Sequence, residues 1–217
     1  MKTEWLFDLN GTVAGRLFRS VDYPWEAMDS LFEYIMRVGR GLNKREFKEL
    51  KRGVWVAESA FVSESAVLLA PIIIDEGAEV RNCSVIEGSI IGKGVVIGNF
   101  SEIRRSVFFD FSTAPMHNYI SDSVIGMSVR LGMGAIASSI RADRGEVICE
   151  SKRGKINTGK NRFGVLVGDG AEIGQSAVLS AGCVVEKGAT VNPLTRARGF
   201  VSASQRYKGE RIIYDLL

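Results

Sequence analysis

The chain has 217 residues, of which 46% are hydrophobic and 24% charged, so it is long enough for one domain or for one domain with an added segment. A net charge of +3 is too small to indicate nucleic-acid binding, and aromatic and basic residues do not interleave as a nucleic-acid surface requires. No apolar run approaches the roughly 18 residues that span a bilayer, so the composition also argues against a membrane partner.

The first 52 residues do not share the repeat that follows, and we interpret them as a partly helical N-terminal cap. A helix is predicted from Pro24, which suits a first helical position, to about residue 39. Its apolar stripe comprises Trp25, Met28, Leu31, Phe32, Ile35 and Met36. A second short helix is predicted to begin at Asn43 and to carry Phe47 and Leu50. We expect this cap to cover the open end of the repeat domain, where strand edges and core would otherwise be exposed.

Residues 5–13, WLFDLNGTV, are similar to the DxDGT signature of the haloacid dehalogenase phosphohydrolases. That chemistry needs a second carboxylate at the position of Asn10, together with a doubly wound α/β domain that the rest of the chain does not predict. We therefore assign no phosphatase site to Asp8.

The N-terminus and the cysteines both favour a cytoplasmic protein. The opening MKTEWLFDLNG has acidic residues where a signal peptide has a basic region followed by an apolar one. Cys83, Cys149 and Cys183 are odd in number, far apart and without a CxxC pair, which is typical of reduced thiols in a cytosolic protein.

From Val56 to Val191, branched or aromatic residues recur about every six positions. A stride of six fits neither the 3.6-residue period of a helix nor an alternating strand, and it is typical of a hexapeptide solenoid. In that fold each hexad forms one face of a triangular prism, and the recurrent residue points to the axis. The residues predicted to point inward are Val56, Val62, Leu68, Ile74, Val80, Ile86, Ile91, Ile97, Ile103, Phe109, Tyr119, Ile125, Leu131, Val167, Ile173, Leu179, Val185 and Val191.

The sequence thus predicts an all-β protein in three parts: the cap at 1–52, a parallel β-helix at 53–200 and a C-terminal tail at 201–217. A two-layer sandwich is the alternative, and the regular stride disfavours it. Two interruptions are expected, at 110–118 and at a basic loop spanning 141–162. The positive charge of this loop suits either a phosphorylated ligand or a solvated surface.

The single histidine, His117, limits the chemistry. Zinc enzymes built on this prism need three imidazole ligands, so we expect no metal site. The chain has neither a GxSxG nucleophile elbow nor a GxxxxGK[ST] phosphate loop. Acyl transfer remains, in which a base removes a proton from an amine or hydroxyl, and His117 is the natural candidate base. An exposed histidine without a role is the alternative.

Three ordered motifs carry a resemblance to a known family: GNFSEIR at 98–104, YISDSVIG at 119–126 and LGMG at 131–134. From about Trp25 to Val201 the chain resembles the hexapeptide-repeat acetyltransferase domain of bacterial and archaeal bifunctional enzymes that acetylate glucosamine-1-phosphate and then uridylylate it. The resemblance implies a left-handed β-helix, a homotrimer and acetyl-CoA as co-substrate. The glycine-rich loop of the nucleotidylyltransferase domain is absent, so uridylyl transfer is not expected.

The resemblance also implies roles for single residues. The family's catalytic histidine lies three residues before the tyrosine that matches Tyr119, and Met116 occupies that position here. One step along an extended chain turns a side chain to the opposite face. The side chain of His117 is therefore expected to point away from the position of the family's base. Glu87 stands where the family has a phosphate-binding arginine. The expected substrate-binding residues are Arg104, Tyr119, Arg130 and Ser139.

Acetyl-CoA is expected to lie between neighbouring prisms of the trimer. Ser180 and Ala181 would contact its pantetheine arm, and either Arg196 and Arg198 or the basic loop at 141–162 would meet its phosphates. The predicted function is N-acylation of an amino sugar phosphate. The alternative is a catalytically inactive trimeric module that binds a sugar phosphate or a nucleotide sugar, or that serves assembly.

Overall fold

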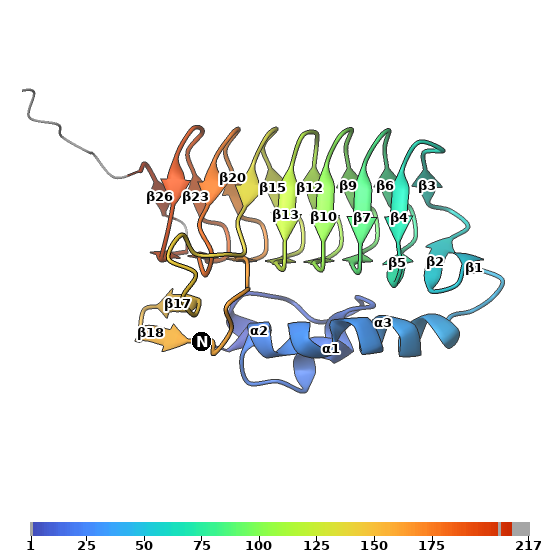
Figure 1. The fold of residues 1–217 in the computed structure, drawn as a ribbon, viewed down its shortest axis with the longest axis horizontal. Helices are drawn as coiled ribbons and strands as arrows, with labels where there is room; N and C mark the ends of the chain where they lie inside the picture. Colours follow the sequence, from blue (N-terminus) through green and yellow to red (C-terminus); the bar gives the residue numbers. More distant parts are fainter. Residues whose placement is uncertain (1, 204, 210–217) are drawn as a thin grey trace, which may run out of the picture.

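Figure 1 shows a straight stack of short strands with a row of helices along its length. This computed structural model describes residues 2–203 and 205–209. Three sheets form the three faces of the stack, here named faces A, B and C. The predicted left-handed parallel β-helix is therefore confirmed.

Neighbouring strands within each face are parallel, except that β1 pairs antiparallel with β2. Face A contains β1 (Phe47–Lys51), β2 (Val54–Ala57), β5 (Ile72–Ile74), β8 (Ile90–Ile91), β11 (Val107–Phe108), β14 (Val124–Ile125), β19 (Leu166–Val167), β22 (Val184–Val185) and β25 (Phe200–Val201). Face B contains β3 (Phe61–Val62), β6 (Glu79–Val80), β9 (Val96–Ile97), β12 (Thr113–Ala114), β15 (Arg130–Leu131), β20 (Glu172–Ile173), β23 (Thr190–Val191) and β26 (Arg206–Tyr207). Face C contains β4 (Val67–Leu69), β7 (Val85–Glu87), β10 (Glu102–Arg104), β13 (Tyr119–Ser121), β16 (Ile136–Ala137), β21 (Val178–Leu179) and β24 (Arg196–Ala197).

The prism interior is a continuous column of buried aliphatic side chains, as the stride predicts. Two of the residues predicted to point inward are misplaced. Phe108 and Ile120 belong to the interior, whereas Phe109 packs outside face A and Tyr119 is exposed. The reason is the coil length, since Phe108 pairs with Ile91 of the preceding coil, 17 residues earlier, and not 18. A strict stride of six therefore overshoots by one residue.

The two expected interruptions differ. Residues 110–118 do not interrupt the solenoid, because β12 continues face B there, so that prediction is wrong. The segment 141–162 is a true insertion, since Val124 pairs with Leu166. It holds an antiparallel hairpin of β17 (Ile148–Ser151) and β18 (Gly154–Asn157).

In the described part of the chain, all helices belong to the N-terminal segment: η1 (Thr3–Trp5), α1 (Gly15–Arg19), α2 (Pro24–Ala27), η2 (Met28–Ser30) and α3 (Leu31–Arg40). The predicted helix that begins at Pro24 is confirmed, with a 3-10 turn in its middle. The helix predicted from Asn43 is wrong, because residues 47–51 form β1 instead. Pairing with β2 satisfies the backbone groups of that segment and overrides its local preference.

The helices lie along face A and not over the open end (Figure 1). Buried aromatic rings join the two layers, and the rings of Phe7 and Phe109 stack with centroids 5.4 Å apart. Only β1 lies where the cap was expected, as the outermost strand beside the first coil. Faces B and C are left uncovered by this segment. None of the helices in the described residues is long and apolar enough to cross a membrane.

The predicted C-terminal tail, 201–217, falls partly outside the described residues, which exclude 204 and 210–217. Within the described part, β26 adds a last strand to face B.

Candidate functional site

The outer surface of face C carries the residues that the matched motifs single out. On β13, Ile120 points inward, so Tyr119 faces outward and is 39% exposed. Tyr119 is paired with Glu102 on one side and with Ile136 on the other. Glu102 and Arg104 flank the inward Ile103 in the same way. The alternation of the strands thus gathers a tyrosine, a carboxylate and a guanidinium on one surface.

Arg104 is held between two carboxylates. Its guanidinium donates hydrogen bonds to Glu102 on its own strand and to Glu87 on β7. The hydrogen bond to Glu102, together with the negative charges of Glu102 and Glu87, raises the pKa of Arg104 above its usual value. Since two carboxylates surround one cation, this cluster has a net negative charge. It does not supply the free positive charge that a phosphate group requires.

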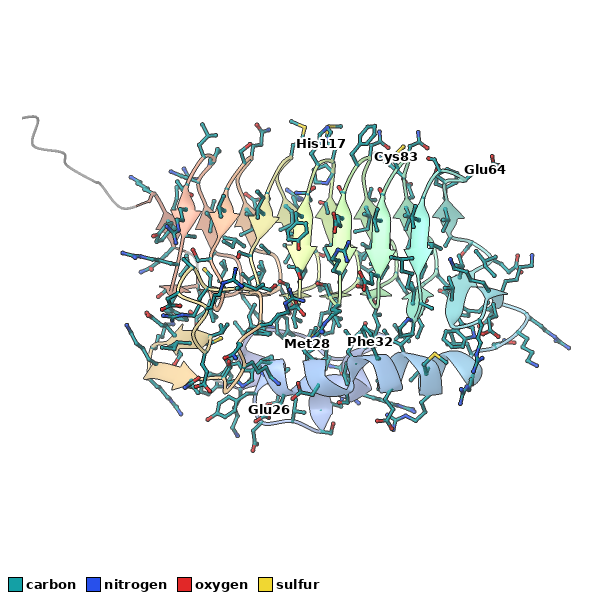
Figure 2. All side chains as sticks on the ribbon, in the orientation of Figure 1. Glu26, Met28, Phe32, Glu64, Cys83 and His117 are labelled. Carbon is teal, nitrogen blue, oxygen red and sulfur yellow. The ribbon has the colours of Figure 1, made fainter. Side chains whose placement is uncertain are left out.

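His117 lies at a corner between β12 and β13, in a left-handed backbone conformation with φ of 54°. Its ring is exposed and stacks on Phe100, with ring centroids 5.4 Å apart and ring planes 6° apart. Phe100 occupies the matching corner of the preceding coil, where the His117 N–H donates to the Asn99 carbonyl. Figure 2 shows His117 on the edge of the prism remote from the helices. Within the described part of the chain, no hydrogen bond joins its side chain to Tyr119 or to a carboxylate.

Two of the expected substrate-binding residues lie apart from Tyr119. Arg130 is on face B, is 76% exposed in its side chain and pairs with Glu172 at 3.4 Å. Ser139 is buried and donates to the Ser121 hydroxyl at 3.3 Å. That hydroxyl donates in turn to the buried carboxylate of Asp122 at 2.6 Å. Ser139 therefore belongs to an internal polar chain and not to an open surface.

The residues expected to bind acetyl-CoA lie further along the same side of the prism as Tyr119. Arg196 on β24 is paired with Val178 of β21, and its Nε donates to the Ser180 hydroxyl at 3.2 Å. Arg198 is exposed, and Ala181 is half-buried. The guanidinium groups of Arg196 and Arg198 are thus on the surface and could meet phosphates.

The basic loop 141–162 is fastened to its surroundings. Arg153 lies over the ring of Trp5, 4.8 Å from its centroid. Ion pairs join Lys152 to Glu186, Lys155 to Glu150, Lys160 to Asp29 and Arg141 to Asp143. The contacts of Arg153 and Lys160 tie the loop to the N-terminal segment, that of Lys152 ties it to the last coils, and the other two pairs lie within the loop. This favours a structural role for much of its positive charge.

The segment similar to the phosphohydrolase signature also has local contacts. The Asp8 carboxylate accepts hydrogen bonds from the backbone and side-chain amides of Asn10. The Asp8 N–H donates to the carboxylate of Asp169 at 2.7 Å. A hollow of about 830 Å³ adjoins this loop on the face-A side, away from Tyr119.

Sequence reasoning missed the pairing of Glu87 and Glu102 with Arg104. Glu102 was within a recognised motif, two residues before Arg104, and that spacing puts both side chains on one side of a strand. The contact with Glu87 depends on the 17-residue coil, which pairs Glu87 with Arg104 across the ladder.

Comparisons with known proteins agree with the motifs. No protein-family model matches the chain. A bifunctional protein GlmU from Methanococcus maripaludis is 23% identical over 210 residues, covering 82% of this chain and 47% of the relative. A GlmU from Bacillus mycoides is 37% identical over 103 residues, covering 48% of this chain and 19% of the relative. The chain thus spans about half the length of the archaeal relative and 19% of the bacterial one.

Solved structures that match the chain include WeeI from Acinetobacter baumannii, at 20% identity and a TM-score of 0.41, covering 67% of this chain and 52% of that one. Another is the UDP-N-acetylglucosamine acyltransferase from Campylobacter jejuni, at 14% identity and a TM-score of 0.38, covering 73% and 68%. The motifs, the left-handed β-helix and the GlmU relatives together confirm the predicted resemblance: the chain is similar to the hexapeptide-repeat acyltransferases, and among them to the acetyltransferase region of GlmU proteins.

Proposed function

We propose that the protein transfers an acyl group from acetyl-CoA to the amino group of a sugar phosphate or nucleotide sugar similar to glucosamine-1-phosphate. The observation that carries this proposal is the clustering of Tyr119, Glu102 and Arg104 on face C, on the same side of the prism as Ser180 and Arg196. The first group would hold the acceptor, and the second would hold the co-substrate. Both groups come from segments within the resemblance to GlmU.

In the reaction the acceptor nitrogen attacks the thioester carbonyl, so a C–N bond forms and the C–S bond breaks. His117 would take the proton from the nitrogen and return it to the departing thiolate, which leaves as a thiol. Tyr119 would position the acceptor with its hydroxyl. A phosphate on the acceptor would be better met by the exposed Arg130 than by Arg104, which two carboxylates already engage.

We further propose a homotrimer in which uncovered faces of neighbouring prisms meet and enclose acetyl-CoA. Such an arrangement would bring Arg130 from face B toward Tyr119 on face C of a neighbour. Sedimentation velocity measures the mass directly, and a monomer at micromolar concentration would contradict this assembly. A cytoplasmic location is proposed as well, since it suits the three free cysteines.

The test is thiol release from acetyl-CoA in the presence of glucosamine-1-phosphate or a nucleotide-linked amino sugar. A Cys83→Ser background removes the exposed thiol of the protein from the assay. We expect turnover that falls by about 10²-fold to 10⁴-fold in His117→Ala, as is typical of the loss of a general base. Turnover that is unchanged by His117→Ala would remove His117 from the mechanism.

The second candidate function is a sugar-phosphate or nucleotide-sugar binding or assembly module without catalysis. The stacking of His117 on Phe100 favours it, as does Met116 at the expected position of the base. Thermal stabilisation by a nucleotide sugar without any thiol release would support this module. Thiol release with any amino-sugar acceptor would exclude it.

A further inference from the structure

A shallow groove of about 780 Å³ runs between α3 and the first coil of the solenoid. Its apolar lining includes Phe32, whose side chain is 42% exposed, and Figure 2 shows Phe32 between α3 and the prism. The remaining apolar lining is Met36, Ala70 and Pro71, and the charged lining is Arg37, Arg40, Arg52 and Glu33. Three guanidinium groups therefore border an apolar floor with only one carboxylate among the lining residues.

Many lysines and arginines of the described chain pair with carboxylates, whereas the arginines of the groove do not. Ion pairs engage Lys48, Arg81, Lys93, Arg104, Arg105, Arg130, Arg141, Lys152, Lys155, Lys160, Arg162 and Lys187. Among the described residues, no carboxylate lies within ion-pair distance of Arg40 or Arg52, and Arg37 stacks only on Tyr34. The groove thus carries positive charge that the chain itself does not neutralise.

The segment around the groove adds to its positive charge. Residues 37–52 contain seven lysines and arginines against two glutamates, and most of these side chains are exposed. A negatively charged occupant would therefore be attracted before contact as well as held after it.

The shape of the groove selects among anionic occupants. Phe32, Met36 and Arg40 follow one another along α3 at steps of four residues, so the apolar and basic sites form a line about 12 Å long. A membrane surface would need a protruding apolar patch, whereas this site is a shallow groove. A linear, concave site with apolar and basic positions suits a peptide segment.

We propose that this groove binds an acidic, amphipathic segment of a partner protein. Apolar side chains of the segment would rest on Phe32 and Met36, and its carboxylates would pair with Arg37, Arg40 and Arg52. The proposal concerns a surface apart from Tyr119 and does not depend on acyl transfer.

The test uses the full chain and a fluorescein-labelled peptide of about 15 residues, with leucines along one helical face and glutamates beside them. Fluorescence anisotropy measures its binding to the wild-type protein and to two double variants. Arg40→Glu/Arg52→Glu changes the groove, and Lys44→Glu/Arg45→Glu changes the same net charge at exposed positions outside the lining. Circular dichroism verifies that each variant is folded.

We expect the groove variant to weaken binding at least about tenfold and the control variant less than about threefold. A scrambled peptide of the same composition, which lacks the apolar face, should also bind at least about tenfold more weakly. Equal effects of the two double variants, or equal binding of the scrambled peptide, would overturn the proposal. It would also be overturned if only phosphatidylserine vesicles bound the groove, or if the groove variant changed the mass of the oligomer in sedimentation, because the occupant would then be a membrane or a second copy.

Discussion

The three cysteines should differ sharply in reactivity, although all are free thiols. Cys83 is exposed at a corner of the prism, whereas Cys149 and Cys183 are buried. Burial raises the pKa of both inner thiols, that of Cys183 to about 12, so neither supplies the reactive thiolate near neutral pH. We predict that Ellman's reagent modifies one thiol in the native protein and three in denaturant. Native modification should vanish in Cys83→Ser, and its persistence there would contradict this assignment.

Glu87 should set the preference for charge in the acceptor. Its carboxylate pairs with Arg104, which lies on the strand next to that of Tyr119, and so adds negative charge to face C. We predict that Glu87→Gln increases kcat/KM for glucosamine-1-phosphate relative to an unphosphorylated amino sugar by about threefold to tenfold, since one repulsive charge is removed. Steady-state thiol release measures the ratio, and calorimetric titration with the phosphorylated sugar provides a second measurement.

The matched control for Glu87→Gln is Glu79→Gln, which removes the same charge from face B, where Glu79 pairs with Arg81. It should leave the ratio unchanged. If both variants raise the ratio equally, the effect comes from the overall charge of the protein and not from a contact on face C.

For single residues, the sequence predicts which residues belong to the candidate site better than it predicts the direction of their side chains. The motifs identified Tyr119 and Arg104, and both are on the outer surface of face C. Phe109 and Tyr119 were nevertheless predicted inside the prism, because a six-residue stride cannot show that a coil has 17 residues. The burial of Ser139 follows from contacts with Ser121 across the ladder, which no local pattern reveals.

Among the elements, α3 depends on a close approach between its backbone and the prism. A Cβ atom added at Gly39 would lie 2.2 Å from Cε3 of Trp55, whose ring packs in the same cluster. We predict that Gly39→Ala lowers the free energy of unfolding by about 1–3 kcal/mol, because the overpacking outweighs the roughly 1 kcal/mol by which alanine favours a helix over glycine. Urea unfolding followed by circular dichroism measures the change.

Gly41→Ala is the control for the same helix. Gly41 ends α3 with φ of −95°, and an added Cβ would meet only the Val38 carbonyl oxygen, at 3.4 Å. Its effect should stay within about 0.5 kcal/mol. A similar loss in both variants would mean that glycine is needed for backbone flexibility and not for the approach to Trp55.

Helices and strands could be predicted where the signals that specify them lie within their own sequence. The helix that begins at Pro24 has a favourable first residue and an apolar stripe, and both signals lie within its own sequence. Residues 47–51 have no such local signal, because β1 forms only through its pairing with β2. The hairpin of β17 and β18 was expected only as a basic loop, because its strands pair with each other and β17 packs on β22 and β25.

For the whole molecule, the repeat determines the prism, but it does not determine which face is covered. Face A has outward apolar residues such as Ile73, Val107 and Val184, which pack against the N-terminal segment. Those residues occupy the position next to the inward one in each hexad. They indicate a covered face, whereas the exposed strand edges and core at the open end of the prism predicted a cap there.

The corners beside this covered face should make stability depend on pH. Asp75 and Asp110 are buried at the edge between faces A and B, and the pKa of each carboxyl is raised from the reference value of 3.8, mainly by desolvation. The groups that face Asp75 are Lys93, whose charge opposes the rise, and Glu76 and Asp110, whose charges add to it. Folding therefore favours the protonated form of Asp75 relative to the unfolded state.

Because its pKa is higher in the folded state than in the unfolded state, Asp75 contributes stability that is fully present below pH 3.8 and is lost as the pH rises through the folded pKa. We predict that Asp75→Asn removes this loss, since the amide oxygen can still accept the Glu76 N–H bond that Asp75 accepts at 2.8 Å. The variant should gain stability relative to wild type as the pH rises from about 4 to 7. Urea unfolding across this range measures the difference. A difference that is constant with pH, or that reverses in sign, would show that the ionised carboxylate is favoured at this corner.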